Sequence, residues 1–172
     1  MERFERAFVT LNRGVVGLIL AAVFAIVFVN VVLRYGFGRS LSWGEESARF
    51  LMVAGAYLGA GLALREGRLV AINALIERLP DALRLAMRYA IAALMIVFML
   101  AVVWIGLRFA VFGADKLTMA TEISRAIPYS AIPIGAAVFV VHGLLFLRRF
   151  VHMEFEGDDA VAGAAPVDES GR

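Results

Sequence analysis

The side chains in this sequence that could carry chemistry are few, and most of them lie near the ends of apolar segments. Cysteine is absent, which excludes disulfides, thiolate metal sites and cysteine nucleophiles. Of the two histidines, His142 falls within an uncharged run and His152 follows that run. A membrane haem usually needs histidines that face each other across helices, so we interpret His142 as hydrogen-bonded to a neighbouring helix. We therefore expect no catalytic residue, no metal site and no bound cofactor.

The acidic side chains also avoid the middle of the apolar segments. No Asp or Glu falls within the uncharged core of any of the four long apolar runs. Proton relays and cation sites at the bilayer midplane usually use a carboxylate at that depth. This distribution argues against an ion pump, an exchanger or a small self-assembling multidrug carrier that works alone.

A charged cluster precedes the second apolar run. Glu45 and Glu46 lie at helical spacing from Arg49, on its amino-terminal side, so both carboxylates are expected to reach the guanidinium. They also fall in a first helical turn, where the helix dipole favours negative charge. The cluster is interpreted either as a charge-balanced helix entry or as a docking patch for a partner on the outer face.

Asn30 and Arg34 are four residues apart and share one face of the first predicted helix. With Tyr35, Arg34 could anchor the helix at the membrane interface, its guanidinium reaching water or lipid phosphate. Alternatively, the pair could make a polar contact with another helix or subunit. Both interpretations stay open at this point.

These residues must be positioned by helices in a membrane. The chain of 172 residues is 62% hydrophobic and 19% charged, against about 45–50% and about 25% in soluble domains. A helix of about 20 residues spans roughly 30 Å, the thickness of the hydrocarbon core. We predict an all-α integral membrane protein with one transmembrane domain over 1–156 and a disordered tail over 157–172. The predicted spans are about 14–33, 43–64, 84–108 and 127–147.

Local signals refine this layout. Ser42, Trp43, Gly44 and Glu45 fit a capping box at the start of the second helix. The apolar positions of 69–79 share one stripe, which predicts a short amphipathic interfacial helix between the second and third spans.

Prolines and small residues add two further expectations. Pro128 suits a first helical turn, whereas Pro133 lies deeper and should kink or loosen the fourth helix. Small residues repeat at close-packing spacing and are expected to pack inside the bundle. These are Gly17, Ala21 and Ala25 in the first span and Gly55, Gly59 and Ala63 in the second.

The basic residues predict the orientation. The N-terminal segment, the loop between the second and third spans and the C-terminal tail hold eleven Lys and Arg, against six on the other side. The positive-inside rule therefore places both termini in the cytoplasm. The net charge of +2 gives no argument for a nucleic-acid partner.

Three segments together resemble the small (Q-type) membrane subunit of TRAP transporters, the tripartite ATP-independent periplasmic transporters. They are 30–35 (NVVLRY), 40–46 (SLSWGEE) and 127–135 (IPYSAIPIG). The resemblance runs from the first span to about Arg149 with the same four-span layout. Members often have a histidine shortly after the second span, where this chain has Arg68.

The resemblance implies a function in the inner membrane of a bacterium. In that family a large subunit carries the substrate and sodium sites, and a periplasmic binding protein delivers the substrate, typically an organic acid. The small subunit braces the large one, is surrounded by lipid and contributes to the docking surface. The candidate partner-interface or motif residues are Asn30, Arg34, Tyr35, Trp43, Glu45, Glu46, Arg49, Pro128, Pro133 and Gly135. The alternative is a membrane anchor of a respiratory redox complex.

Overall fold

The computed structural model describes residues 2–67 and 80–152, which form four α-helices and no strand. The helices are α1 (Glu2–Phe37), α2 (Ser42–Arg65), α4 (Asp81–Phe112) and α5 (Ala126–His152). Each is long and apolar enough to cross a membrane, which confirms the four predicted spans. The amphipathic helix predicted over 69–79 and the disordered tail predicted over 157–172 lie outside the described residues.

The helices extend beyond the predicted spans, since the charged residues that flank each apolar run are also helical. α1 has 36 residues and α4 has 32, against about 20 needed to cross the hydrocarbon core. α1 ends where Gly38 adopts a φ of +65°. The N–H of Arg39 then donates to the carbonyl of Leu33 over 3.1 Å, which satisfies an open carbonyl at the helix end.

The capping box predicted at Ser42 is wrong. Ser42 is already the first residue of α2, and the N-cap position is Leu41, which offers no side-chain acceptor. The loop into α2 is held by α1 instead, because Oδ1 of Asn30 accepts a hydrogen bond from the N–H of Leu41 over 2.8 Å. An acceptor on the neighbouring helix therefore replaces the local one.

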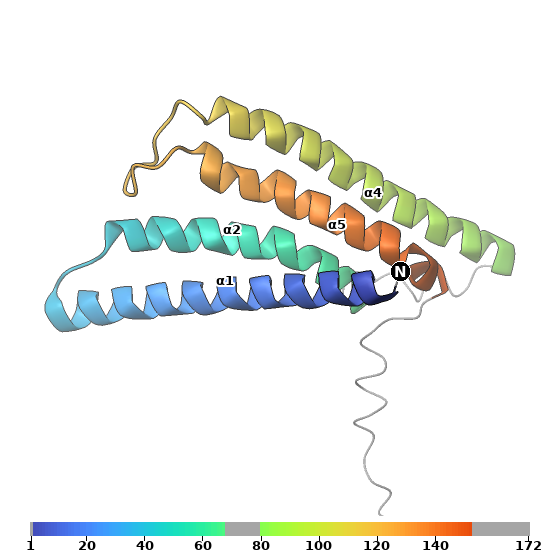
Figure 1. The fold of residues 1–172 in the computed structure, drawn as a ribbon, viewed down its shortest axis with the longest axis horizontal. Helices are drawn as coiled ribbons and strands as arrows, with labels where there is room; N and C mark the ends of the chain where they lie inside the picture. The colour runs from blue at the N-terminus through green and yellow to red at the C-terminus, as the bar shows by residue number, and fades with distance from the viewer. Residues whose placement is uncertain (1, 68–79, 153–172) are drawn as a thin grey trace, which may run out of the picture.

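The four helices lie side by side in a single layer, in the order α1, α2, α5, α4 (Figure 1). The extensive packing is between α1 and α2, between α2 and α5, and between α5 and α4. The loops 38–41 and 113–125 lie together at one end, called here the loop end. The start of α1 and the ends of α2 and α5 lie at the other end, called here the terminal end.

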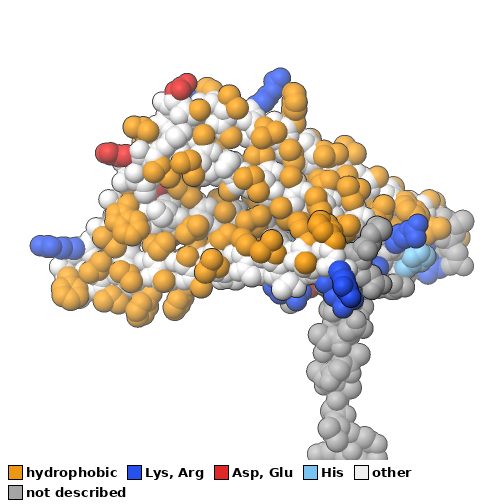
Figure 2. All heavy atoms as spheres, in the orientation of Figure 1, with side chains coloured by type: hydrophobic (Ala, Val, Ile, Leu, Met, Phe, Trp, Pro, Cys, Tyr) orange, Lys and Arg blue, Asp and Glu red, His pale blue; other side chains and the backbone are white. Residues whose placement is uncertain are grey.

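The core is concentrated around α5, near the terminal end. Phe139, Phe146 and Val151 are at most 2% exposed, and they pack with Leu64 of α2 and Ala92 of α4. The outer helix α1 instead presents large apolar side chains such as Phe24 and Phe28 on the surface. Orange apolar side chains therefore cover much of the face drawn in Figure 2, as a lipid or protein environment requires.

The two small-residue repeats have different surroundings. A Cβ added at Gly55 would lie 3.3 Å from Ile19, and one at Gly59 would lie 3.7 Å from Val16, so these glycines face α1. Gly17 has no neighbour within 4 Å of such a Cβ, and Ala21 and Ala25 are exposed. The prediction of internal packing is therefore right for Gly55 and Gly59 and wrong for the α1 repeat, which points outward.

Candidate functional site

Asn30 joins α1 to the start of α2 at the loop end. Its side chain is buried, with 8% of the residue exposed. Oδ1 accepts from the N–H of Leu41 over 2.8 Å, and Nδ2 donates to Oε1 of Glu45 over 3.4 Å. Of the two interpretations of Asn30, the structure therefore shows a polar contact between helices of the same chain.

Glu45 pairs with α1 rather than with Arg49. Its Oε1 lies 3.7 Å from Nη1 of Arg34, and both side chains are more than half exposed. Within the described residues, neither Glu45 nor Glu46 forms an ion pair with Arg49, so the predicted pairing along the helix is wrong. The reason is that each carboxylate finds donors on another segment.

Glu46 holds the connection between α4 and α5. Its carboxylate accepts hydrogen bonds from the backbone N–H groups of Met119, Ala120 and Thr121 over 3.1, 3.1 and 2.8 Å. The hydroxyl of Thr121 adds a fourth bond over 2.9 Å. These bonds fix a loop more than 70 residues further along the chain, and the bridge between Leu117 and Ser124 closes the loop on itself. Glu46 thus links the start of α2 to the loop between α4 and α5.

The remaining motif residues of the loop end are exposed. Tyr35 is 83% exposed and Trp43 is 47% exposed, and Arg49 also lies on the surface. Aromatic side chains of this kind are enriched at membrane–water interfaces. Their exposure leaves them available to lipid or to another protein.

Two of the three motif residues of α5, Pro133 and Gly135, lie in contacts between helices. Pro128 falls in the first turn of α5 as predicted, and Pro133 is buried inside the helix, which continues through it. A Cβ at Gly106 would lie 2.9 Å from the Pro133 ring, so Gly106 leaves α4 the space for this proline. A Cβ at Gly135 would lie 2.5 Å from Cβ of Tyr57 and 2.8 Å from its backbone carbon. Gly135 therefore sets the close approach of α5 to α2.

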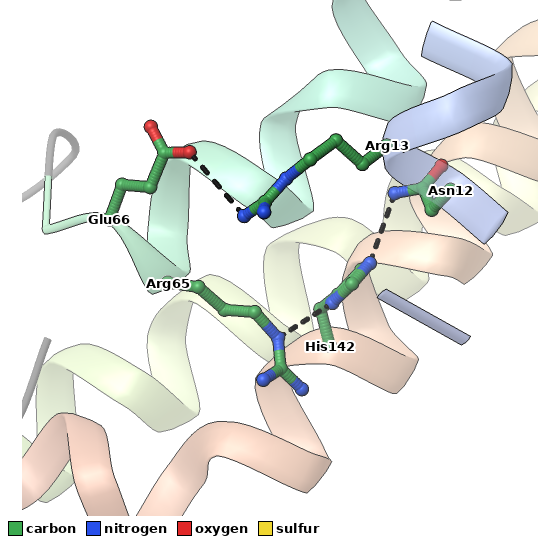
Figure 3. A network of polar contacts seen from close by, with 5 residues as sticks. All are labelled: Asn12, Arg13, Arg65, Glu66 and His142. Carbon is green, nitrogen blue, oxygen red and sulfur yellow. Dashed lines mark hydrogen bonds and ion pairs between the residues drawn. The ribbon is translucent and has the colours of Figure 1, made fainter. Parts of the chain in front are cut away.

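A buried polar network lies toward the terminal end and connects α1, α2 and α5 (Figure 3). His142 is fully buried, with Nδ1 2.9 Å from Nε of Arg65 and Nε2 3.0 Å from Nδ2 of Asn12. This confirms the interpretation of His142 as hydrogen-bonded to neighbouring helices. Because a guanidinium can only donate, Nδ1 of His142 is the acceptor in the bond to Arg65.

Arg65 is the charged centre of this network. It is 1% exposed, and its Nη1 lies 2.7 Å from Oε1 of Glu5 on α1. Its guanidinium also lies 5.3 Å from the ring centre of Phe146, within the range of a cation–π contact. A buried arginine needs such a carboxylate and acceptors, since an uncompensated charge is strongly disfavoured in an apolar environment.

The sequence indicated only part of this network. His142 was identified from its depth in an apolar run. Arg65 looks in the sequence like the charged residue that ends a membrane helix, and no pattern around Glu5 or Asn12 indicates that they are buried contacts. The sequence does contain a glycine, Gly61, at the position of α2 that faces His142. In the structure an added Cβ there would lie 2.5 Å from Cδ2 of His142, so only a glycine leaves space for the ring. The described residues contain no group of three or more potential metal ligands, and the network is suited to holding helices together.

Comparison with known proteins gives two matches. The family described as the DctQ component of tripartite ATP-independent periplasmic transporters matches residues 23–152. A protein of Haemophilus influenzae named as a TRAP transporter small permease is 30% identical over 129 residues, which cover 74% of each chain. The matched region contains all three motif segments at the loop end and in α5.

Proposed function

The chain belongs to the DctQ component family of TRAP transporters, and from this premise we propose that it is the small, non-catalytic membrane subunit of such a transporter. In this role it supports a large subunit that performs sodium-coupled uptake of an organic acid. A periplasmic binding protein supplies the substrate. The large subunit and the binding protein together determine which organic acid is transported.

The single-layer arrangement of the helices carries the proposal. A layer of four helices buries each outer helix on one side only, so α1 packs mainly on α2, and α4 mainly on α5 (Figure 1). Large apolar side chains of α1, such as Leu18, Phe24 and Phe28, are more than half exposed. Broad apolar faces of this kind suit a protein that covers the side of a larger membrane subunit.

The small residues that repeat on the outward side of α1 indicate which surface of the chain contacts the large subunit. Gly17, Ala21 and Ala25 recur every four residues and leave their side of the helix flat. Small residues at this spacing allow another transmembrane helix to approach closely, whereas lipid chains gain little from them. We therefore place the large subunit against this side of α1.

The loop end is proposed as the side that faces the periplasm and the binding protein. The positive-inside rule favours this orientation, because the terminal end carries most of the basic residues. Glu46 holds the loop 117–124 in one conformation, and a fixed surface loses less entropy when a partner docks. Both termini would then be cytoplasmic, in a bacterial inner membrane.

Co-purification tests the assembly. A tagged chain, extracted from its own membranes in mild detergent, should retain a much larger multi-span protein. Replacing both Ala21 and Ala25 by leucine should reduce the amount retained, because the larger side chains separate the two helices. The matched control is the pair Ala90→Leu and Ala93→Leu, two exposed alanines on one face of α4.

Two results would contradict this assignment. Purification of the chain alone, under conditions that preserve other membrane complexes, would count against a subunit role. A loss of the large protein in the α4 control but not in the α1 variant would move the contact face to α4.

The alternative of a redox anchor finds no support in the described residues. The two nitrogens of His142 lie at hydrogen-bonding distance from Arg65 and Asn12 and are not directed at an open site. An absorption spectrum of the purified protein would show a haem Soret band if the alternative were correct.

A further inference from the structure

Aromatic and basic side chains alternate where α4 reaches the loop end. Trp104, Arg108 and Phe112 are spaced four residues apart and are therefore neighbours on one side of the helix, and Lys116 follows in the loop. The guanidinium carbon of Arg108 lies 5.0 Å from the ring centre of Trp104, and Nζ of Lys116 lies 3.3 Å from the ring centre of Phe112. Both contacts are in the range of a cation–π interaction. These four residues are called here the aromatic–basic row.

Both cations of the row are open to an outside ligand. Arg108 and Lys116 are exposed, and the residues that they stack on, Trp104 and Phe112, are 61% and 64% exposed. Within the described residues neither cation forms an ion pair, and Asp115, beside Lys116 in the sequence, forms none either. A ring face attracts a cation, but guanidinium and ammonium groups still carry N–H donors that can bind an anion. The row therefore offers two positioned cations to an anionic group.

The row lies at the boundary between hydrocarbon and lipid headgroups. Arg108 directly follows the uncharged run 89–107, and Lys116 lies beyond the end of α4. Tryptophan is enriched at this boundary, and arginine reaches from it toward lipid phosphate. Toward the middle of the membrane, α4 continues with Leu100 and Val97, which are 50% and 63% exposed. Cations at the headgroup level with apolar side chains below them match the outline of a phospholipid.

The outer surface of α4 suits lipid better than a neighbouring helix. α4 forms the edge of the layer opposite α1 (Figure 1). Large side chains such as Phe98 and Ile105 are 61% and 64% exposed and make its surface uneven. Close packing of helices in membranes uses small residues, whereas flexible acyl chains can follow an uneven surface. A shallow groove of about 260 Å³ is lined by Trp104, Leu107, Arg108 and Val111.

We infer that the aromatic–basic row binds the phosphate of an anionic phospholipid from the leaflet at the loop end. Arg108 can donate two parallel hydrogen bonds to phosphate oxygens, and Lys116 adds a second positive charge. An acyl chain of the same lipid lies in the groove beside Trp104. Two cations favour a headgroup with a net negative charge over phosphatidylcholine, whose choline carries its own positive charge. The inference requires a membrane-embedded chain and does not depend on the transporter role.

The two tryptophans of the chain allow a test that reports on this site alone. Trp43→Phe leaves Trp104 as the only tryptophan, so the fluorescence comes from the row. The full-length variant is reconstituted in phosphatidylcholine vesicles with phosphatidylglycerol as the minor component. Either one lipid or the other carries bromine on its acyl chains, which quenches an indole at close range. We expect phosphatidylglycerol to quench Trp104 more than its share of the membrane predicts.

Charge removal should abolish most of this preference. In the Trp43→Phe background, Arg108→Gln should lower the relative affinity for phosphatidylglycerol about fivefold, the effect of one cation near an anionic membrane surface. Lys116→Gln should lower it by a similar factor, and it is the second test if Arg108→Gln does not fold by circular dichroism. The matched control is Arg39→Gln, an exposed arginine at the same end that follows α1. This control should keep the preference.

Each of three outcomes would contradict the inference. Quenching of Trp104 by the two lipids in proportion to their shares would show that the row does not select an anionic headgroup. An equal loss of preference in Arg108→Gln and Arg39→Gln would indicate general surface charge. The absence of quenching by either lipid would show that protein, such as a second copy of the chain, covers this edge of α4.

Discussion

Nε of Arg65 donates a hydrogen bond to Nδ1 of His142 over 2.9 Å, between two side chains that are 1% and 0% exposed. The bond joins the last turn of α2 to the middle of α5, 77 residues later. Glu5 brings α1 into the same contact through its ion pair with Arg65. Three of the four helices are thus connected through one buried guanidinium.

Removal of the charge on Glu5 should destabilise the protein. In Glu5→Gln, Arg65 stays buried but loses a carboxylate at 2.7 Å. Breaking one side of a buried pair costs about 3–5 kcal/mol, and we expect about 3 kcal/mol here, because Glu5 keeps 18% side-chain exposure. The free energy of unfolding, from urea titration in detergent followed by circular dichroism, measures the loss.

The double variant Glu5→Gln with Arg65→Met provides the control. It removes both charges and leaves an unbranched apolar side chain against Phe146, so it should be more stable than Glu5→Gln alone. Arg65→Met alone is measured as well. If the stability loss of the double variant equals the sum of the losses in Glu5→Gln and in Arg65→Met, the two charges do not interact.

Gly61→Ala should disrupt the buried network by steric overlap. The new Cβ would lie 2.5 Å from Cδ2 and 2.9 Å from Cγ of His142, a ring whose two nitrogens lie 2.9 Å from Nε of Arg65 and 3.0 Å from Nδ2 of Asn12. Overpacking of this kind costs about 1–3 kcal/mol. Gly59→Ala is the matched control, because its Cβ meets Val16 at an ordinary 3.7 Å. Equal unfolding free energies for the two variants would contradict this packing.

Asn30, and not Ser42, should stabilise the start of α2. Asn30→Ala removes the acceptor of the Leu41 N–H and should lower the unfolding free energy by about 1 kcal/mol, as for loss of an N-cap. Ser42→Ala should change it little, because no side-chain cap bond is present there. The opposite result, with Ser42→Ala the more harmful, would restore the capping box that the sequence suggested.

Glu46→Ala should release the loop between α4 and α5. The amides of 119–121 lose the carboxylate that accepts their hydrogens and should exchange with deuterium faster, as seen by mass spectrometry of the protein in detergent. Glu45→Ala removes the neighbouring carboxylate, which faces α1, and should leave exchange of that loop unchanged. Slow exchange in Glu46→Ala would show that the loop is held by its own internal bonds.

The sequence alone determined the four membrane helices and the depth of His142. In lipid, a spanning segment must satisfy its backbone hydrogen bonds internally, so a long apolar run is sufficient to predict a helix. The hydrogen-bonded state of His142 followed for the same reason, since a polar group at that depth needs a partner. The motif order also carried the family resemblance, through residues close together in the chain.

Only the tertiary structure decided which helices are neighbours and which polar groups meet. The pairing of Glu5 with Arg65 and the loop contacts of Glu46 join residues 60 or more positions apart, and no local pattern encodes them. The same holds for Asn30, which replaces the cap predicted at Ser42. Apolar helices look alike on all sides in sequence, so their order in the layer depends on where small residues such as Gly55 and Gly135 allow a close approach.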